Sequence, residues 1–151
     1  MTTTAGRRTS ALYAGLALTT LVALAPLIDT VTVDIIADHV RAAYPEWPAD
    51  QVRLDRTAIV SWIAVTNALG IPLWLWVIRL TGKGHRRARA VASWSFAAGA
   101  SLALLNLGFG GEHYETIVPM PFGLLGLLPV IAGAAALVPM WRRRAVPQEA
   151  R

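Results

Sequence analysis

Cysteine is absent from this chain of 151 residues, and charged side chains are scarce. Without cysteine the chain has no disulfide framework, no thiol nucleophile and no thiol–disulfide relay. Asp, Glu, Lys and Arg together make up 15% of the residues, whereas soluble domains carry about 25%. The hydrophobic content of 55% also excludes intrinsic disorder. The composition is therefore atypical of an ordinary globular protein.

Asp, Glu, Lys, Arg and His are missing altogether from four long runs. The runs cover residues 10–28, 58–78, 90–109 and 117–140. Each is close to the ~20 residues that an α-helix needs to cross a hydrocarbon layer of ~30 Å. They are apolar all round, whereas a core helix of a soluble protein keeps a polar stripe. We predict an all-α, polytopic integral membrane protein, in which residues 10–140 form an up-down bundle of four transmembrane helices.

The first run has an alternative interpretation as a signal peptide. Arg7 and Arg8 precede it, and residues 23–25 (Ala-Leu-Ala) match a small-x-small cleavage pattern. Pro26 follows at a position where signal cleavage tolerates proline poorly, and the run is longer than the usual apolar region of a signal peptide. We therefore expect an uncleaved first helix, preceded by a short tail of residues 1–9.

The basic residues predict the orientation. Eleven of the fourteen fall on one side of the predicted membrane, in the N-terminal tail, the connection 79–89 and a basic C-terminal tail of residues 141–151. Eight of the nine acidic residues fall on the other side. The net charge is therefore +10 on the first side and −5 on the second. By the positive-inside rule both termini are cytoplasmic. The net charge of +5 is thus a topology signal and gives no reason to expect a nucleic-acid partner.

The source membrane follows from composition alone. Arginine supplies thirteen of the fourteen basic residues, and alanine is abundant. Both features favour a GC-rich bacterial genome, and we expect a bacterial plasma membrane.

The outer loop 29–57 contains a short amphipathic pattern. Apolar residues recur there at steps of three and four: Val33, Ile36, Ala37, Val40 and Tyr44. Asp34, Asp38 and Arg41 fall on the opposite face, with Asp38 and Arg41 three residues apart. We predict a short helix, within a cap of residues 31–48, that lies on the outer leaflet or covers the bundle. Asp50 is the expected N-cap of a helical turn leading into the second span.

The outer connections hold the only chemically reactive grouping in the sequence. Asp34, Asp38, His39, Glu112 and His113 are carboxylates and imidazoles that could bind a divalent metal or transfer protons. Their spacing matches no metal signature, so no metal or cofactor is predicted. We interpret the group as a solvated acidic loop, and retain Asp34, His39, Glu112 and His113 as catalytic candidates under the alternative below.

Within the spans the strongest polar groups are Asn67 and Asn106. Buried amides of this kind usually hydrogen-bond between helices, and less often contact a ligand. The six tryptophans are interpreted as an interfacial belt and as packing. Because no span holds an Asp, Glu, Lys, Arg or His, proton-coupled transport is disfavoured.

Two classes of function remain open. The first is a non-catalytic membrane protein, either an accessory subunit of a larger complex or a binder of a lipid-like molecule. The second is a membrane-embedded enzyme or small transporter with a polar site at the outer mouth of the bundle. Under either class the expected partners are the lipid bilayer and, in addition, another membrane protein or a second copy of the chain.

Overall fold

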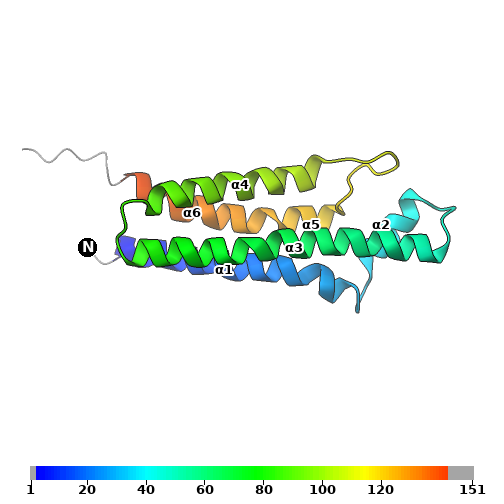
Figure 1. Ribbon diagram of the computed structural model, residues 1–151, viewed down its shortest axis with the longest axis horizontal. Coiled ribbons are helices and arrows are strands. Elements are labelled where there is room, and N and C mark those ends of the chain that lie inside the picture. The colour runs from blue at the N-terminus through cyan, green and yellow to red at the C-terminus, as the bar shows by residue number, and fades with distance from the viewer. Residues whose placement is uncertain (1–2, 143–151) are drawn as a thin grey trace, which may run out of the picture.

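The computed structural model describes residues 3–142, and every regular element in that range is a helix. The elements are α1 (Thr3–Asp29), α2 (Ile35–Ala43), α3 (Ala49–Gly82), α4 (Ala88–Gly108), α5 (Met120–Leu125) and α6 (Leu127–Arg142). α1, α3, α4 and the consecutive α5 and α6 run up and down beside one another (Figure 1). The all-α bundle of four long apolar helices, with a short additional helix, is confirmed.

The outer surface of the bundle is apolar. In the most apolar 18 residues of each long helix, only 11–33% of the residues are buried. The exposed side chains are large: Leu21, Leu69, Trp94, Leu104 and Ile131 are each more than 60% exposed. A surface of this kind is stable against lipid and unstable in water. The helices are therefore suited to a lipid bilayer, as in a multi-pass membrane protein.

The four long helices pack as a ring in the order α3, α1, α6, α4. α1 packs extensively against α3 and α6, and α4 packs against α6. The ring closes between α4 and α3, where contacts are sparsest. The seam between α3 and α4 is consequently the weakest side wall of the bundle.

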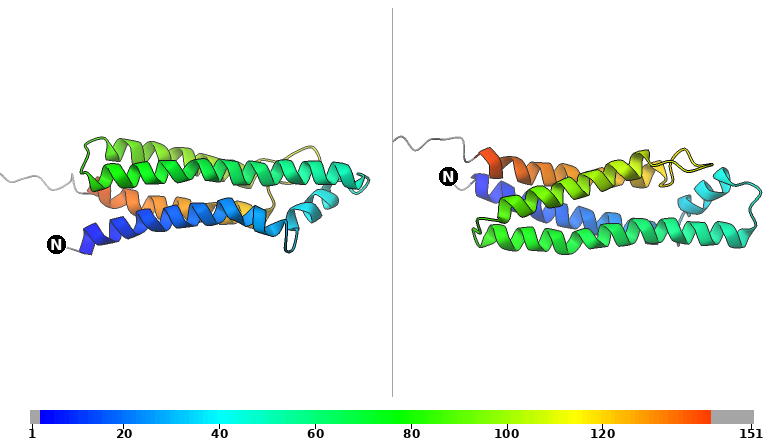
Figure 2. Two further views of the ribbon diagram at one scale, coloured as in Figure 1. Left: turned by 60° about the horizontal axis from the view of Figure 1, so that its bottom comes forward. Right: turned by 45° about the horizontal axis from the view of Figure 1, so that its top comes forward.

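The two ends of the bundle, seen from two sides in Figure 2, differ in charge. The basic end consists of the turn from α3 to α4 together with the start of α1 and the end of α6, and the turn carries Arg79, Lys83, Arg86, Arg87 and Arg89. The acidic end consists of the connection from α1 to α3, which includes α2, and the connection from α4 to α5. In the predicted basic C-terminal tail, Arg143, Arg144 and Arg151 lie outside the described residues.

α3 is far longer than the apolar run that predicts it. At 1.5 Å per residue its 34 residues extend for about 51 Å, against ~30 Å of hydrocarbon. Its first turns carry Asp50, Arg53, Asp55 and Arg56 and form part of the acidic end. The expectation that Asp50 is the N-cap is wrong. Pro48 is the N-cap, because its carbonyl accepts the N–H groups of Gln51 and Val52.

The fourth span is interrupted at Gly126, between α5 and α6. Pro129, three residues later, has no N–H to donate to the carbonyl four residues before it, and its ring crowds that turn. The interruption therefore lies where the proline weakens the helical hydrogen bonds.

Candidate functional site

α2 covers the acidic end of the bundle as a cap. Ile36, Ala37 and Val40 are buried, and Ile36 and Val40 share a hydrophobic cluster with side chains of α3 and α5. Val33, expected on the same face, is 70% exposed because it precedes the helix. The predicted pair of Asp38 and Arg41 forms an ion pair at 2.8 Å on the exposed face.

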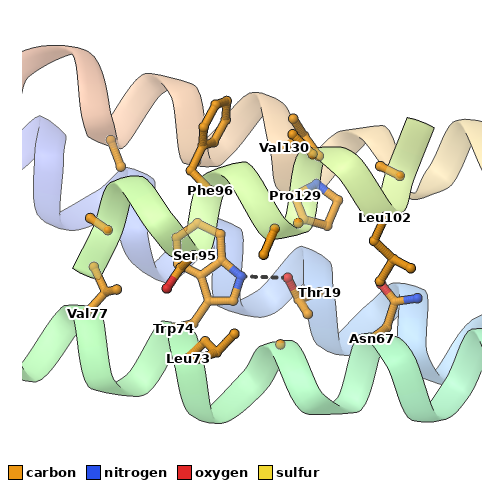
Figure 3. Close-up of a pocket in the computed structure, with 18 of the residues that line it drawn as sticks. Thr19, Asn67, Leu73, Trp74, Val77, Ser95, Phe96, Leu102, Pro129 and Val130 are labelled. Atoms are coloured by element: carbon orange, nitrogen blue, oxygen red, sulfur yellow. Dashed lines mark hydrogen bonds between the residues drawn. The ribbon is translucent and has the colours of Figure 1, made fainter. Parts of the chain in front are cut away.

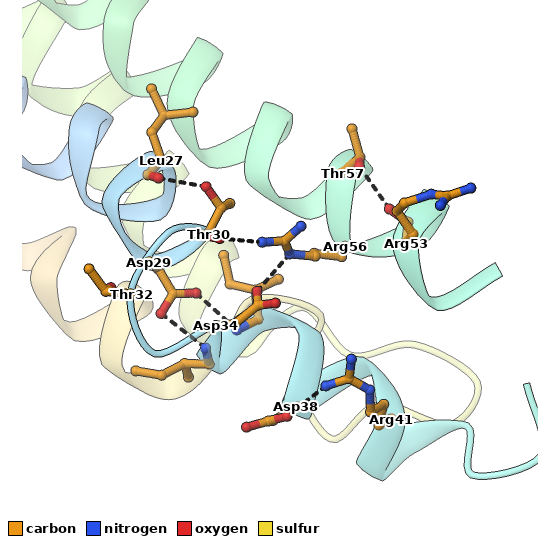
Figure 4. Close-up of polar contacts among 12 residues, drawn as sticks. Leu27, Asp29, Thr30, Thr32, Asp34, Asp38, Arg41, Arg53, Arg56 and Thr57 are labelled. Carbon is orange, nitrogen blue, oxygen red and sulfur yellow. Dashed lines mark hydrogen bonds and ion pairs between the residues drawn. The ribbon is translucent and has the colours of Figure 1, made fainter. Parts of the chain in front are cut away.

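Asp29 fixes the start of α2. Its carboxylate is only 6% exposed and accepts the backbone N–H groups of Ile35 and Ile36 at 2.9 and 3.1 Å (Figure 4). These are among the donors that a helix leaves unpaired at its N-terminus. A negative charge there is also favoured by the helix dipole. Asp29 thus couples the end of α1 to the cap.

Arg56 ties the same turn to α3. Its guanidinium donates to the carboxylate of Asp34 at 2.6 Å and to the carbonyl of Thr30 at 2.9 Å (Figure 4). Asp34 has a left-handed backbone, with φ of 61°, a conformation that aspartate tolerates better than most residues. Asp34 is therefore an ion-pair partner that holds the α1–α2 turn.

Four aromatic and imidazole rings join α2 to the α4–α5 connection. His39 stacks on Tyr114 with ring centroids 5.1 Å apart, and one imidazole nitrogen lies 2.8 Å from the carbonyl of Thr116. Tyr44 contacts Tyr114 edge to face at 5.2 Å and His113 at 5.0 Å. The hydroxyl of Tyr114 donates to the carboxylate of Asp55 on α3. Both histidines therefore pack in the cap.

The catalytic candidates at the acidic end do not converge. Asp34 pairs with Arg56, His39 with a backbone carbonyl, and His113 with a tyrosine ring. Glu112 is exposed and has no hydrogen bond or ion pair within residues 3–142. In that range, no three His, Asp or Glu side chains lie close enough together to hold a metal ion. His39 and His113 thus flank the same pair of tyrosine rings, whereas Asp34 pairs with Arg56 instead.

Tyr114 gives the cap a dependence on alkaline pH. Burial, followed by the hydrogen bond to Asp55, raises the pKa of its hydroxyl above the ordinary value of 10.0. The unfolded chain then loses this proton at lower pH than the folded chain. Stability contributed by Tyr114 is present below pH 10 and falls as pH rises beyond it.

We expect Tyr114→Phe to show a smaller loss of stability between pH 10 and pH 11 than the unsubstituted chain. Reversible unfolding in detergent at a series of pH values measures the difference. Equal losses in both proteins would show that Tyr114 ionises with equal ease in the folded and unfolded states.

The central part of the bundle encloses a cavity of about 320 Å³ (Figure 3). Side chains of α1, α3, α4 and α6 line it, and most are apolar. Its polar lining consists of Thr19, Thr66, Asn67, Trp74, Ser95 and Asn106. Among residues 3–142, no charged side chain contributes to the wall. A volume of about 300–1,000 Å³ with a few polar groups is typical of small-molecule sites.

Both predicted amides line this cavity, but their hydrogen bonds differ. Asn106 of α4 accepts the indole N–H of Trp62 from α3 at 3.0 Å, and so joins two helices across the seam. Asn67 donates to the carbonyl of Ile63 in its own helix at 2.8 Å. Its side-chain carbonyl has no partner among the described residues, although an amide has two donors and an acceptor to satisfy. Asn67 thus retains hydrogen-bonding capacity toward the cavity.

Trp74 lines the cavity beside α1, where its indole packs against Gly15. The indole N–H of Trp74 donates to the hydroxyl of Thr19 at 2.8 Å, and that hydroxyl donates to the carbonyl of Gly15. The far edge of the indole lies where a side chain at position 15 would project. Glycine at this position therefore lets the edge of the indole approach the backbone of α1 closely and leaves the cavity open.

The cavity opens through the seam between α3 and α4. Leu69 and Leu73 of α3, and Ala98 and Gly99 of α4, line it and are also exposed on the outer surface of the bundle. Residues that line the cavity and are also exposed on the outer surface mark an opening. Because it lies among the apolar outer faces of the helices, the opening faces lipid rather than water.

The sequence distinguishes Asn67 and Asn106 as polar groups within the spans. It does not reveal the cavity, or that Trp74 lines it. Trp74 was interpreted as belt or packing, because nothing in its local sequence distinguishes the two. One available signal was the spacing of Gly15 and Thr19. A small residue one turn before a hydroxyl residue favours close approach of another helix.

No protein-family model matches the chain, and neither a curated protein nor a solved structure matches it. The function has to be inferred from the cavity and the cap alone.

Proposed function

We propose that the chain binds a lipid-like molecule in the cavity between α3, α4 and α6, without catalysing a reaction on it. The observation that carries this proposal is an apolar cavity of about 320 Å³ that opens sideways between α3 and α4. Its lining has no charged group, so the ligand offers apolar surface and few charges. A molecule dissolved in the bilayer reaches such an opening without passing through water.

We propose further that the protein resides in a bacterial plasma membrane with the basic end in the cytoplasm. The support is the positive-inside rule, applied to a basic turn at 79–89 and basic tails beside the spans. The abundance of arginine over lysine supports the bacterial source. In this orientation α2 and its aromatic contacts face outward.

Single cysteines test the orientation cleanly, since the chain has none of its own. Gly82→Cys places a thiol at the basic end, where an added side chain meets no atom within 4 Å. Ala42→Cys places one on the exposed surface of α2. In intact cells a membrane-impermeant maleimide should label Ala42→Cys and leave Gly82→Cys unlabelled until lysis. Labelling of Gly82→Cys alone before lysis would reverse the orientation.

A matched pair of substitutions on α4 tests the binding proposal. Ala98 lines the cavity, whereas its neighbour Ala97 is exposed and does not line it. Leucine at position 98 fills part of the opening. Each protein is purified in nanodiscs of bacterial lipid extract and examined by native mass spectrometry. We expect a bound small molecule on the unsubstituted chain and on Ala97→Leu, and its loss from Ala98→Leu. Equal occupancy in all three proteins, or none, would contradict binding at this site.

A further inference from the structure

The cavity is long and narrow. On α4 its lining extends from Ala92 to Asn106, which is about 21 Å along the helix at 1.5 Å per residue. On α3 it extends from Thr66 to Val77, or about 17 Å. This elongated slot matches the shape of an extended hydrocarbon chain better than that of a compact fused-ring molecule.

The two ends of this slot differ. Toward the basic end its walls are buried apolar side chains, which belong to one hydrophobic cluster: Leu12, Val77, Ala92, Ala136 and Met140. This end is therefore closed and mainly apolar, and the hydroxyl of Ser95, one turn from Ala92 on α4, is the polar group nearest to it. Toward the acidic end lie Thr66, Asn67 and Asn106, and Figure 3 shows Asn67 and Val77 at opposite ends of the row of α3 side chains.

Unused hydrogen-bonding capacity in the polar half belongs to the two amides. The hydroxyl of Thr66 donates to the carbonyl of Trp62, and the side-chain carbonyl of Asn106 accepts the indole N–H of Trp62. Asn106 keeps its amide N–H groups, whereas Asn67 keeps both a side-chain carbonyl and one N–H without a partner among the described residues. With no cation or anion in the wall, the best match is an uncharged group that both donates and accepts, such as a hydroxyl.

We propose that the ligand is a single-chain lipid with an uncharged hydroxyl or amide group, held with its methyl end toward the basic end and its polar group at Asn67. This inference rests on the proposed function and adds the class and the direction of the ligand. The closed apolar end accepts the chain terminus, and the polar half accepts the head.

Two photoreactive forms of hexadecanol test the direction. One carries a diazirine at the methyl end and the other carries it beside the hydroxyl. On the full chain in nanodiscs, the first should label residues around Val77 and Met140. The second should label residues around Asn67 and Leu102, which lie together in Figure 3. The reverse pattern, or the same residues labelled by both probes, would overturn the proposed direction.

Asn67→Leu tests the polar contact, because leucine is close to asparagine in size but cannot hydrogen-bond. Unlabelled hexadecanol and hexadecane are each used to compete with the methyl-end probe. On the unsubstituted chain, hexadecanol should reduce labelling at a concentration roughly tenfold lower than hexadecane does. We expect that preference to vanish in Asn67→Leu and to persist in Ser101→Leu, whose serine is exposed and outside the cavity. An unchanged preference in Asn67→Leu would overturn the contact, and Asn67→Ala provides the same test if the leucine variant fails to fold.

The two proposals fail differently. If Ala98→Leu abolishes labelling but both probes label the same residues, the proposed direction is contradicted and lipid binding in the cavity is not. If the probes label only the outer faces of the helices, and Ala98→Leu does not change that labelling, both proposals are contradicted.

Discussion

Replacing Gly15 with alanine should destabilise the bundle by about 2 kcal/mol and close the cavity. An added Cβ would overlap three atoms at the far edge of the Trp74 indole, the most distant of them at 2.7 Å. Overpacking of this kind costs about 1–3 kcal/mol, and displacement of the ring also breaks its hydrogen bond to Thr19. The helix propensity of alanine offsets about 0.5–1 kcal/mol. The displaced indole has only the cavity to enter, so ligand occupancy should fall as well.

Gly99→Ala is the matched control for this change. Gly99 is also helical, but an added Cβ there meets no atom within 4 Å. Its stability should therefore stay the same or rise slightly. Reversible unfolding in mixed micelles measures both variants. If Gly15→Ala unfolded like Gly99→Ala, the close packing of Trp74 on α1 would be refuted. A smaller destabilisation by Gly15→Ala in a Trp74→Phe background would show that the clash is with this ring.

Asp29→Ala should detach the cap from the bundle. The substitution removes the carboxylate that accepts the backbone N–H groups of Ile35 and Ile36. Ile36 is fully buried, so its N–H would have no access to water. Hydrogen bonds to a charged acceptor contribute about 1.5–3 kcal/mol, and a buried donor left unpaired costs about as much. We expect a loss of about 2–3 kcal/mol in the stability of α2. Amide hydrogen exchange of residues 35–43 should accelerate by roughly thirtyfold or more, while exchange in the spans stays unchanged.

Asp38→Ala serves as the control within the same helix. Asp38 forms an ion pair with Arg41, but both side chains are more than half exposed, at 71% and 60%. Pairs so exposed contribute little, and exchange in α2 should change by no more than about threefold. Equal acceleration in Asp29→Ala and Asp38→Ala would show that the cap depends on the net charge of the acidic end rather than on this buried carboxylate.

The fold was predictable because its main signal is local. A run such as 90–109 without one ionisable residue requires a helix once it lies in lipid, since every backbone group must then be paired within the segment. The cap helix was equally visible in the spacing of Ile36, Val40 and their neighbours. The extra turns of α3 were visible only as a helical turn after Asp50, because residues 50–57 are mostly polar and Val52 is buried through contacts with distant residues.

The candidate site was predictable only in part, because it depends on contacts between distant segments. Asn67 and Asn106 stand out as amides among apolar residues, and both line the cavity. The volume itself arises from how far apart α3 and α4 lie, which no local pattern encodes. Likewise the acidic residues at 29 and 34 look alike in the sequence. One accepts backbone N–H groups and the other binds Arg56, a distinction that follows from the path of the turn.

An experimental structure of the full chain in nanodiscs of bacterial lipid extract tests lipid binding in the bundle most directly. We predict one elongated density between α3 and α4, extending from the level of Asn67 to that of Val77 and unbranched at the basic end. Ala98→Leu should abolish that density. A cavity filled by the protein's own side chains, with α3 and α4 in close contact along the seam, would contradict the proposal.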